Sequence, residues 1–460
     1  MLLKNFLVRQ KCGFVFALFA TWILCAAHSE NSESKESQEN ITLTISDAVK
    51  IALENNISIK RSEIQLDAAR RAKKSSWNSA SPSLSVGGAF SKNNENFSEN
   101  YSAYIQGRIS VSLSTNLYSD IKAANLKYEA GEISYEAAAR AVELNVRTAF
   151  YNLLYQKENV ALWQQNLDTS QEQYQMNRRK YSQGAISQID VLTSQVNYEK
   201  NIPLLQNAQI TLENDEAFFK KMLGLEQDAQ ISLQGDLDEI VEIFNGEMNE
   251  GFASLAQDFL KDAEKNNAEI AALEKNIEIA KNEILAKRFS AYAPSLNAAW
   301  TFQPTWAKTP AAGTSGPDER GALSLSVTIP LDGVLPWSKP ANLISDAKDS
   351  LEDYELQIQD KKTEIQVSAQ SGVRKIEQLL ATMRTLQSSV ELAERSYQMT
   401  AEAYNRGSRN FTELLSAQNS LEQARLNLKQ QAFSLAQEIL NLENLLGVPF
   451  GTLLEFKTNS

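Results

Sequence analysis

The sequence predicts a mainly α-helical protein built from two copies of one unit, each with two β-strands and a long helical hairpin. The first observation is an internal repeat: Tyr181–Leu192 reads YSQGAISQIDVL and Tyr404–Leu415 reads YNRGSRNFTELL, 223 positions later. The offset holds without a gap as far as Leu223-Gly224 and Leu446-Gly447. Solenoid repeats are only about 20–50 residues long, so this repeat indicates a duplicated half-protein rather than a stack of small units.

Four segments alternate between apolar and small polar residues, which is the period of a β-strand with two different faces. A polar loop is predicted at 91–101 between the first two strands, and a Pro/Gly-rich loop at 303–321 between the last two. The alternating apolar residues are Leu84, Val86, Phe90, Ile109, Val111, Leu113, Leu296, Ala298, Trp300, Phe302, Leu323, Leu325, Val327 and Ile329. This pattern is the weak signature of a membrane β-barrel, and a soluble β-sandwich gives it as well.

Four strands cannot close a membrane barrel, because known barrels have about eight or more strands. Open sheet edges are not tolerated in lipid either. If the four strands lie in a membrane, several chains must therefore share one barrel.

The remaining chain is predicted to be long helix. A first helix begins at Thr44 or Ser46 and ends near Ser81-Pro82, and a helix over 121–181 would be about 90 Å long at about 1.5 Å per residue. Its partner begins near Ser187. Apolar residues then recur every seven positions in both copies: Val191, Tyr198, Leu205, Leu212 and Phe219, and Leu414, Leu421, Leu428, Leu435 and Leu442. Such sustained heptads predict coiled-coil-like packing, with Pro203 at a kink on a solvent-facing turn.

The N-terminal residues 1–27 are predicted to be a secretory signal peptide. Lys4, Arg9 and Lys11 precede an uncharged apolar run that is too short for a spanning helix. Cleavage after Ala27 would remove both cysteines of the chain, and with them any disulfide or thiolate site. The alternatives are an uncleaved anchor helix and a lipidated N-terminus at Cys25. Residues 28–43 are predicted to be a flexible segment.

The composition excludes several classes of function. The chain has 45 basic and 57 acidic residues, a net charge of −12, which is a poor surface for nucleic acid. His28 is its only histidine, and no nucleotide-binding G-x-x-x-x-G-K-[ST] string occurs. We therefore expect no enzyme activity, no cofactor, no metal site and no nucleic-acid partner. The expected organisation is a first repeat at 44–225, a connector at 226–250, a second repeat at 251–450 and a tail at 451–460.

The order of signal, helix, strand pair and long hairpin, present twice, resembles the TolC-like outer-membrane efflux proteins. The resemblance covers about residues 41–450 and includes the turn motifs GAISQIDV at Gly184–Val191 and GSRNFTELL at Gly407–Leu415. It implies a homotrimer in the outer membrane that extends into the periplasm. Each chain would contribute four strands to a shared β-barrel, with Val111, Leu113, Leu325 and Val327 facing outer-membrane lipid. The helices would form a periplasmic α-barrel.

The resemblance also assigns roles at the two hairpin turns. Asp190 would accept hydrogen bonds from Tyr404 and Arg409 in a closed periplasmic gate, and Glu413 would face the pore. The family example has a second acid where this chain has Ser416, which weakens the expectation of a two-layer acidic ring. The turns would also contact a periplasmic adaptor protein through Gly184, Ala185, Ile186, Arg406, Gly407 and Ser408.

The sequence leaves two hypotheses for the function. The leading hypothesis is a passive exit duct that works with the adaptor and an inner-membrane transporter to export small molecules or proteins. The alternative is a structural coiled-coil tether between layers of the envelope, which would share the heptads but would not need two matched pairs of alternating strands. Solvated charges at the helix ends are the alternative to a gate. The sequence does not identify the exported substrate.

Overall fold

A computed structural model describes residues 41–95, 98–237, 267–309, 313–314 and 318–455. Chain contacts divide it into a small unit, Met1–Ile41 with Ala229–Ser232, and a large unit, Thr42–Asp228 with Leu233–Ser460. The predicted signal peptide, the lipidation at Cys25 and most of the predicted connector lie outside the described residues.

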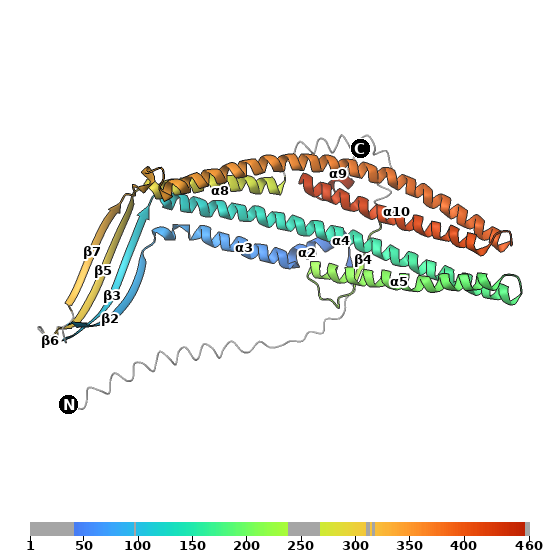
Figure 1. The fold of residues 1–460 in the computed structure, drawn as a ribbon, viewed down its shortest axis with the longest axis horizontal. Coiled ribbons are helices and arrows are strands. Elements are labelled where there is room, and N and C mark those ends of the chain that lie inside the picture. Colours follow the sequence, from blue (N-terminus) through green and yellow to red (C-terminus); the bar gives the residue numbers. More distant parts are fainter. Residues whose placement is uncertain (1–40, 96–97, 238–266, 310–312, 315–317, 456–460) are drawn as a thin grey trace, which may run out of the picture. The chain divides into compact units, whose positions relative to one another are not determined.

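The helices and strands of the large unit follow the predicted order twice (Figure 1). The first series is α2 (Ile45–Asn55), α3 (Ile57–Lys74), the 3₁₀ helix η1 (Ser76–Ala80), β2 (Ser83–Glu95), β3 (Ser98–Ser114), α4 (Asn116–Ser182) and α5 (Gln188–Leu223). The second is α8 (Ala268–Tyr292), β5 (Ser295–Thr309), the short β6 (Gly313–Thr314), β7 (Asp318–Thr328), the 3₁₀ helix η2 (Asp332–Val334), α9 (Lys339–Asn405), α10 (Phe411–Leu446) and the short α11 (Thr452–Glu455). The short strands β1 (Ile41–Leu43) and β4 (Ile231–Leu233) lie outside this scheme.

The two long hairpins have the same dimensions. Helices α4 and α9 each have 67 residues, α5 and α10 each have 36, and all four boundaries keep the offset of 223. The duplication that the turn motifs indicate therefore extends back to the first residue of each long helix.

The four long strands form an antiparallel sheet in the order β2-β3-β5-β7 with two different faces. Leu84 lies opposite Ile109, Ile109 opposite Trp300, and Trp300 opposite Leu323, so these side chains share one face. Because side chains alternate along a strand, the other face carries mainly serine, threonine and asparagine. The predicted lipid-facing residues all fall on the apolar face: Val111, Leu113, Leu325 and Val327.

Two segments predicted as loops are mostly strand, and one predicted helix is broken. β2 and β3 stay paired to Glu95 opposite Ser98, and β5 continues to Thr309. The prediction relied on apolar side chains, whereas a ladder of backbone hydrogen bonds continues through polar residues. The predicted first helix stops at Asn56, which has extended backbone angles (φ −61°, ψ 131°) and separates α2 from α3.

Asn56 belongs to a joint that is also duplicated. Its side-chain Oδ1 accepts from Ser58 N at the start of α3, and its Nδ2 donates to Met222 O at the end of α5, at 2.8 Å each. Asn267 repeats both roles at the start of α8, where its Nδ2 donates to Leu445 O at 3.0 Å. Each asparagine therefore caps one helix and fixes the end of another.

The C-terminal end of α10 is held by a buried carboxylate. Glu443 has no exposed surface, and its oxygens accept from Gly451 N at 3.0 Å and from Leu453 N at 2.8 Å. Arg140 of α4 donates to the carbonyls of Glu443 and Val448. Burial raises the pKa of the Glu443 carboxyl, and the two amide hydrogen bonds oppose that shift.

The two hairpins differ in what they bury near their turns. Between residues 155 and 204 every buried side chain is polar: Ser170, Gln173, Asn177, Ser194, Asn197 and Asn201. The matching part of the second hairpin buries Leu379, Leu380, Met383, Tyr404, Phe411, Leu414 and Leu421, with Gln418 as its one buried polar residue. The heptad prediction is therefore confirmed at Leu414 and Leu421, but Val191 and Tyr198 are only half-buried. Pro203 is exposed inside α5, as predicted.

Candidate functional site

The two hairpin turns have the same backbone. Gly184 and Gly407 have φ values of +70° and +76°, the left-handed region that glycine adopts without strain. Ala185 N donates to Lys180 O, and Ser408 N donates to Ala403 O, both at 2.9 Å. A glycine followed by a backbone hydrogen bond from the next residue to the carbonyl five positions earlier is a common end of a helix. The glycines are thus required by the turn itself.

The predicted gate acids both lie in the first turn of their own helices. Asp190 and Glu413 occupy the third position of α5 and α10. Asp190 Oδ2 accepts from Ser187 N at 3.2 Å and from Ser187 Oγ at 2.8 Å, which completes a capping box. Glu413 N donates to Asn410 Oδ1 at 2.8 Å, and the Glu413 carboxylate pairs with Arg409 at 2.8 Å. The negative charge of Glu413 is therefore partly balanced within its own turn.

Tyr404 is the buried centre of the second turn. Its side chain is 7% exposed and its ring lies 5.8 Å from the ring of Phe411. The Tyr404 hydroxyl donates to Asn177 Oδ1 of α4 at 2.5 Å, and Lys180 Nζ lies 4.3 Å from the ring centre. Burial raises the Tyr404 pKa first, and the nearby Asp190 charge raises it further. A hydroxyl has one hydrogen, so in this conformation Tyr404 donates to Asn177 and not to Asp190.

Asn177 is a site residue that the sequence reasoning missed. It is fully buried, it belongs to the first hairpin, and it receives the only hydrogen bond that the Tyr404 hydroxyl can donate. Tyr181 stands in the first repeat where Tyr404 stands in the second, yet it is 46% exposed. The sequence signal for Asn177 was a polar residue at a helix position that faces the second hairpin. Polar residues on helices are usually exposed to solvent, so this signal did not single out Asn177.

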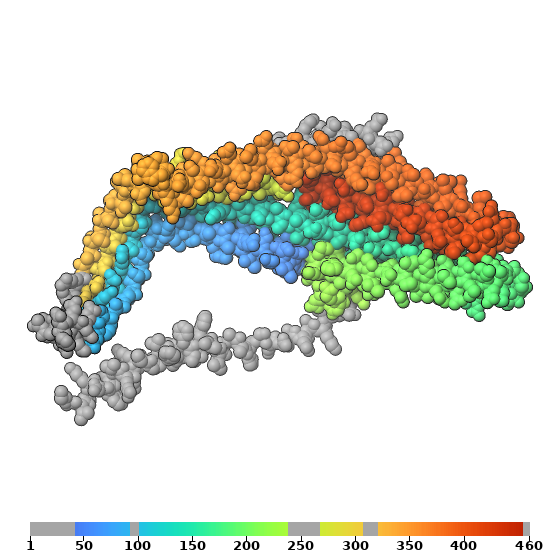
Figure 2. Space-filling view, viewed as in Figure 1, coloured from blue at the N-terminus to red at the C-terminus, as the bar shows by residue number. Residues whose placement is uncertain are grey.

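Two more contacts join the first hairpin to the second. Gln173 Nε2 of α4 donates to Gln418 Oε1 of α10 at 3.0 Å in a buried setting. Lys429 of α10 pairs with Glu158 of α4 at 2.7 Å. Figure 2 shows the two hairpins in contact near their turns. Near the turns the hairpins are therefore joined by the hydrogen bonds of Asn177 and Gln173, and further from the turns by the Lys429–Glu158 ion pair and the stacked rings of Tyr155 and Phe433, 5.8 Å apart.

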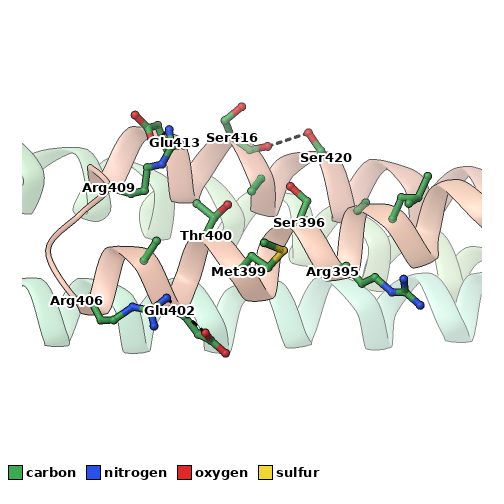
Figure 3. A pocket seen from close by; sticks show the side chains of 14 residues that line it. Arg395, Ser396, Met399, Thr400, Glu402, Arg406, Arg409, Glu413, Ser416 and Ser420 are labelled. Atoms are coloured by element: carbon green, nitrogen blue, oxygen red, sulfur yellow. Dashed lines mark hydrogen bonds and ion pairs between the residues drawn. The ribbon is translucent and has the colours of Figure 1, made fainter.

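A groove of about 1070 Å³ runs along the exposed side of the second hairpin (Figure 3). Its lining includes three arginines and two glutamates, which pair locally: Arg406 with Glu402, Arg409 with Glu413, and Arg395 with Glu391 just outside the lining. Ser416, at the place of the second family acid, lines the same groove beside Glu413.

The residues expected to contact an adaptor lie at the ends of the hairpins. Ala185, Arg406, Gly407 and Ser408 are exposed, as is Gly184, whereas Ile186 is half-buried. The reasoning missed an exposed apolar stripe that begins beside the first turn, with Ile189 at 74%, Leu192 at 52% and Val196 at 66% exposure. Its spacing of three and four residues is visible in the sequence and marks one face of α5.

None of the described helices combines the length and apolar character that a membrane-crossing helix needs. The described residues also contain no cluster of three or more His, Cys, Asp or Glu side chains placed to bind a metal ion.

The fold is similar to that of solved outer-membrane proteins, several of which are channels. VceC of Vibrio cholerae is 14% identical, with a TM-score of 0.67 over 88% of this chain and 96% of its own. The CmeC outer membrane channel of Campylobacter jejuni is 16% identical, with a TM-score of 0.67 over 92% of each chain. The MtrE outer membrane channel of Neisseria gonorrhoeae, solved in an open state, is 18% identical, with a TM-score of 0.63 over 88% and 89%. No curated protein matches the sequence significantly.

The sequence profile of outer membrane efflux proteins matches residues 48–225 and 259–448. The chain therefore belongs to the outer membrane efflux protein family. This confirms the predicted family and the predicted fold of duplicated long hairpins with a β part. It also places the chain in the outer membrane, with an extension into the periplasm. Members of the family are channels rather than enzymes, form trimers and work in tripartite pumps.

Proposed function

We propose that this chain is one subunit of a homotrimeric exit duct. The observation that carries the proposal is the sheet, which has one apolar face, one serine-rich face and two open edges. Three copies would pair their edges into a barrel of about twelve strands, which removes the open edges that lipid does not tolerate. The apolar face would then meet lipid, and the serine-rich face would line a water-filled interior.

The helices also present unpaired surfaces that a neighbouring copy would cover. The exposed stripe Ile189, Leu192 and Val196 lies on α5, and the groove on the second hairpin includes the exposed Leu392 and Met399. Packing a stripe of one copy into the groove of the next would continue the helices around a closed tunnel. This arrangement is a head-to-tail contact, which closes into a ring when the rotation fits.

The gate is proposed to be at the two hairpin turns. Asp190, Tyr404 and Glu413 lie in the first or last turn of their helices, and Arg409 lies in the turn between α9 and α10, so all four are at the same end of the hairpins. In one chain Arg409 is engaged by Glu413, and Asp190 by Ser187, so the Asp190 link to Tyr404 and Arg409 would form between neighbouring hairpins of the closed trimer. Exposed ion pairs contribute about 0–1 kcal/mol each, so three copies could bias a reversible gate.

The exposed ends of the hairpins are proposed to receive a periplasmic adaptor protein, through Gly184, Ala185, Ile186, Arg406, Gly407 and Ser408. An inner-membrane transporter would then supply both the substrate and the energy. The observations that support this are the exposure of five of these residues and the membership of a family that works in tripartite pumps.

The test is single-channel conductance of the purified protein in a planar bilayer. We expect a small, steady current for the wild type and a larger one for Arg409→Ser. Arg395→Ser is the matched control, because Arg395 lines the same groove and makes an equally short ion pair, 2.7 Å against 2.8 Å, further from the turn. An equal rise in both variants would assign the effect to groove charge and not to the gate. No current from well-folded protein would favour the structural tether.

A further inference from the structure

The exposed apolar row of the edge strand does not stop where the strand stops. Along β7 the alternating side chains Leu323, Leu325 and Val327 are 78%, 71% and 64% exposed. The same alternation continues past the strand end with Ile329 at 59% and Leu331 at 70%. The segment then presents Val334, Leu335 and Trp337, the last at 75% exposure. We name residues 329–339 the second corner, because they connect the sheet to α9.

The second corner is held rigidly against α8. Tyr292 Oη donates to Gly333 O at 2.8 Å. A Cβ at Gly333 would lie 2.8 Å from Tyr292 Cε1 and 3.0 Å from Ala291 Cβ, closer than real contacts allow. The buried side of the corner is therefore close-packed, while its apolar side chains point outward. An exposed apolar segment fixed in this way needs an occupant that covers it.

The first corner, residues 70–77, lies at the opposite edge of the sheet, where α3 leads into β2. Trp77 is 59% exposed and follows four cations within one helical turn: Arg70, Arg71, Lys73 and Lys74. Arg70 and Lys73 lie over the ring of Tyr128, at 6.0 Å and 4.5 Å from its centre. In the described part of the chain, Arg71 and Lys74 are exposed and make no ion pair.

The second corner has free cations of its own. Lys339 is exposed at the start of α9, and Arg288 is exposed on α8 one turn before Tyr292. Neither residue pairs with a carboxylate within the described ranges. A chain with a net charge of −12 thus gathers unpaired positive charge beside exposed tryptophan at both edges of its sheet.

We propose that the two corners bind the anionic headgroups of phospholipids at the membrane surface from which the helices emerge. Tryptophan is favoured at the boundary between headgroups and acyl chains, where one side of the ring is apolar and the other is wet. Lysine and arginine beside it attract anionic lipid. A second copy of the chain is the alternative occupant. The unbroken apolar row from β7 into the second corner also favours lipid as the occupant.

This inference rests on the proposed assignment of the apolar face to lipid, and it adds the membrane boundary and the chemistry of the lipid. The first test uses variants that keep one tryptophan and replace the others by phenylalanine. They are assembled in phosphatidylcholine vesicles with bromine either near the headgroup or near the end of the acyl chain. Bromine quenches the fluorescence of a tryptophan that it contacts. Trp300, 46% exposed on the apolar face, reports the sheet, and Trp163 within α4 reports protein outside the membrane.

We expect the shallow bromine to quench Trp77 and Trp337 more than the deep bromine does. Trp300 should be quenched, and Trp163 should be quenched by neither. If Trp77 and Trp337 behave like Trp163 while Trp300 is quenched, the corners are covered by protein or water, and only this inference fails. If Trp300 is not quenched either, the lipid-facing assignment of the sheet fails as well. Should a single-tryptophan variant fail to assemble, removing one tryptophan from the wild type gives the same information by difference.

The second test addresses the charge of the headgroup. Brominated phosphatidylglycerol replaces brominated phosphatidylcholine at equal mole fraction, and quenching of Trp77 is compared. We expect phosphatidylglycerol to quench on the order of twofold more, because each cation near the surface favours anionic lipid. Arg71→Gln with Lys74→Gln should bring the ratio of quenching by phosphatidylglycerol to quenching by phosphatidylcholine to about one. The matched control is Lys60→Gln with Arg61→Gln, about 20 Å further along α3, which should keep the wild-type ratio. A wild-type ratio of one would overturn the anionic preference.

Discussion

A charge on the apolar face of the sheet tests the proposed membrane assembly most directly. Leu325 lies on β7 three residues before the strand ends, opposite Ala298 of β5, and is 71% exposed in the chain. Replacing it therefore removes little packing within the chain itself. We expect Leu325→Arg to leave the helices folded and to prevent insertion of the sheet. The free-energy cost would come from placing the charge against the surroundings of the sheet, and not from unfolding one subunit.

The size of the effect follows from the depth of the residue. Arginine on the lipid face of a barrel costs about 2–4 kcal/mol at the middle of the bilayer. At about 1.4 kcal/mol per tenfold, this is a factor of about 30 to 700 in the insertion equilibrium for each chain. In a symmetric trimer the cost would apply three times, about 6–12 kcal/mol, which is comparable to the whole stability of many folded domains.

The assay is the yield of trimer in isolated outer membranes, with secretion of the chain measured in parallel. Ser326→Arg is the matched control, because it places the same charge one residue further along β7, on the serine-rich face opposite Asn297. We expect Leu325→Arg to reduce trimer yield at least tenfold and Ser326→Arg to reduce it little. Normal yield from Leu325→Arg, or equal losses from the two variants, would refute the lipid-facing assignment.

Three further predictions follow from the turns and the joints. Tyr404→Phe should lower the free energy of unfolding by about 1–3 kcal/mol and raise ion leak, because it leaves the buried oxygen of Asn177 without a donor; Tyr181→Phe, at the exposed equivalent position, should change neither. Asn267→Ala should cost about 1–2 kcal/mol in urea unfolding, and Asn267→Asp should recover only the helix cap, because aspartate cannot donate to the carbonyl at the end of α10. Burial raises the pKa of Glu443, so the folded chain holds this proton at a higher pH than the unfolded chain does; its contribution to the free energy of unfolding should fall as the pH rises above about 4.5, and urea midpoints of Glu443→Gln should depend less on pH over that range.

The architecture could be predicted from the sequence because the same order of strands and hairpins occurs twice in the chain. Two alternating strand pairs and two hairpins with glycine turns each reinforce the interpretation of the other copy. The strand ends were not predictable from side-chain pattern, since the pairing from Lys92 to Glu95 depends on backbone partners in β3. The break at Asn56 was not predictable either, because its side chain bonds to a helix end 166 residues away in the sequence.

Of the candidate site, the sequence indicated the turns but not their partners. Gly184 and Gly407 follow from local backbone geometry, which adjacent residues determine. The bond between Tyr404 and Asn177 depends on which helix of the first hairpin lies beside the second, and a single sequence does not contain that information. The link from Asp190 to Tyr404 and Arg409 stays a prediction, because it belongs to contacts between neighbouring hairpins.

The polar side chains that are buried near the turn of the first hairpin have a mechanical consequence. Leucine and isoleucine side chains lock two helices by shape, so sliding one past the other opens voids and costs several kcal/mol. Amide and hydroxyl side chains, such as Asn201 between α4 and α5 and Gln173 and Asn177 against the second hairpin, can exchange one hydrogen-bond partner for another, and a shift of a few ångströms then costs little buried area. The hairpins should therefore be stiff where Leu435 and Ile439 pack and compliant where the polar side chains meet. A tube built from such helices would bend at the end where the hairpin turns lie, while the rest keeps its diameter.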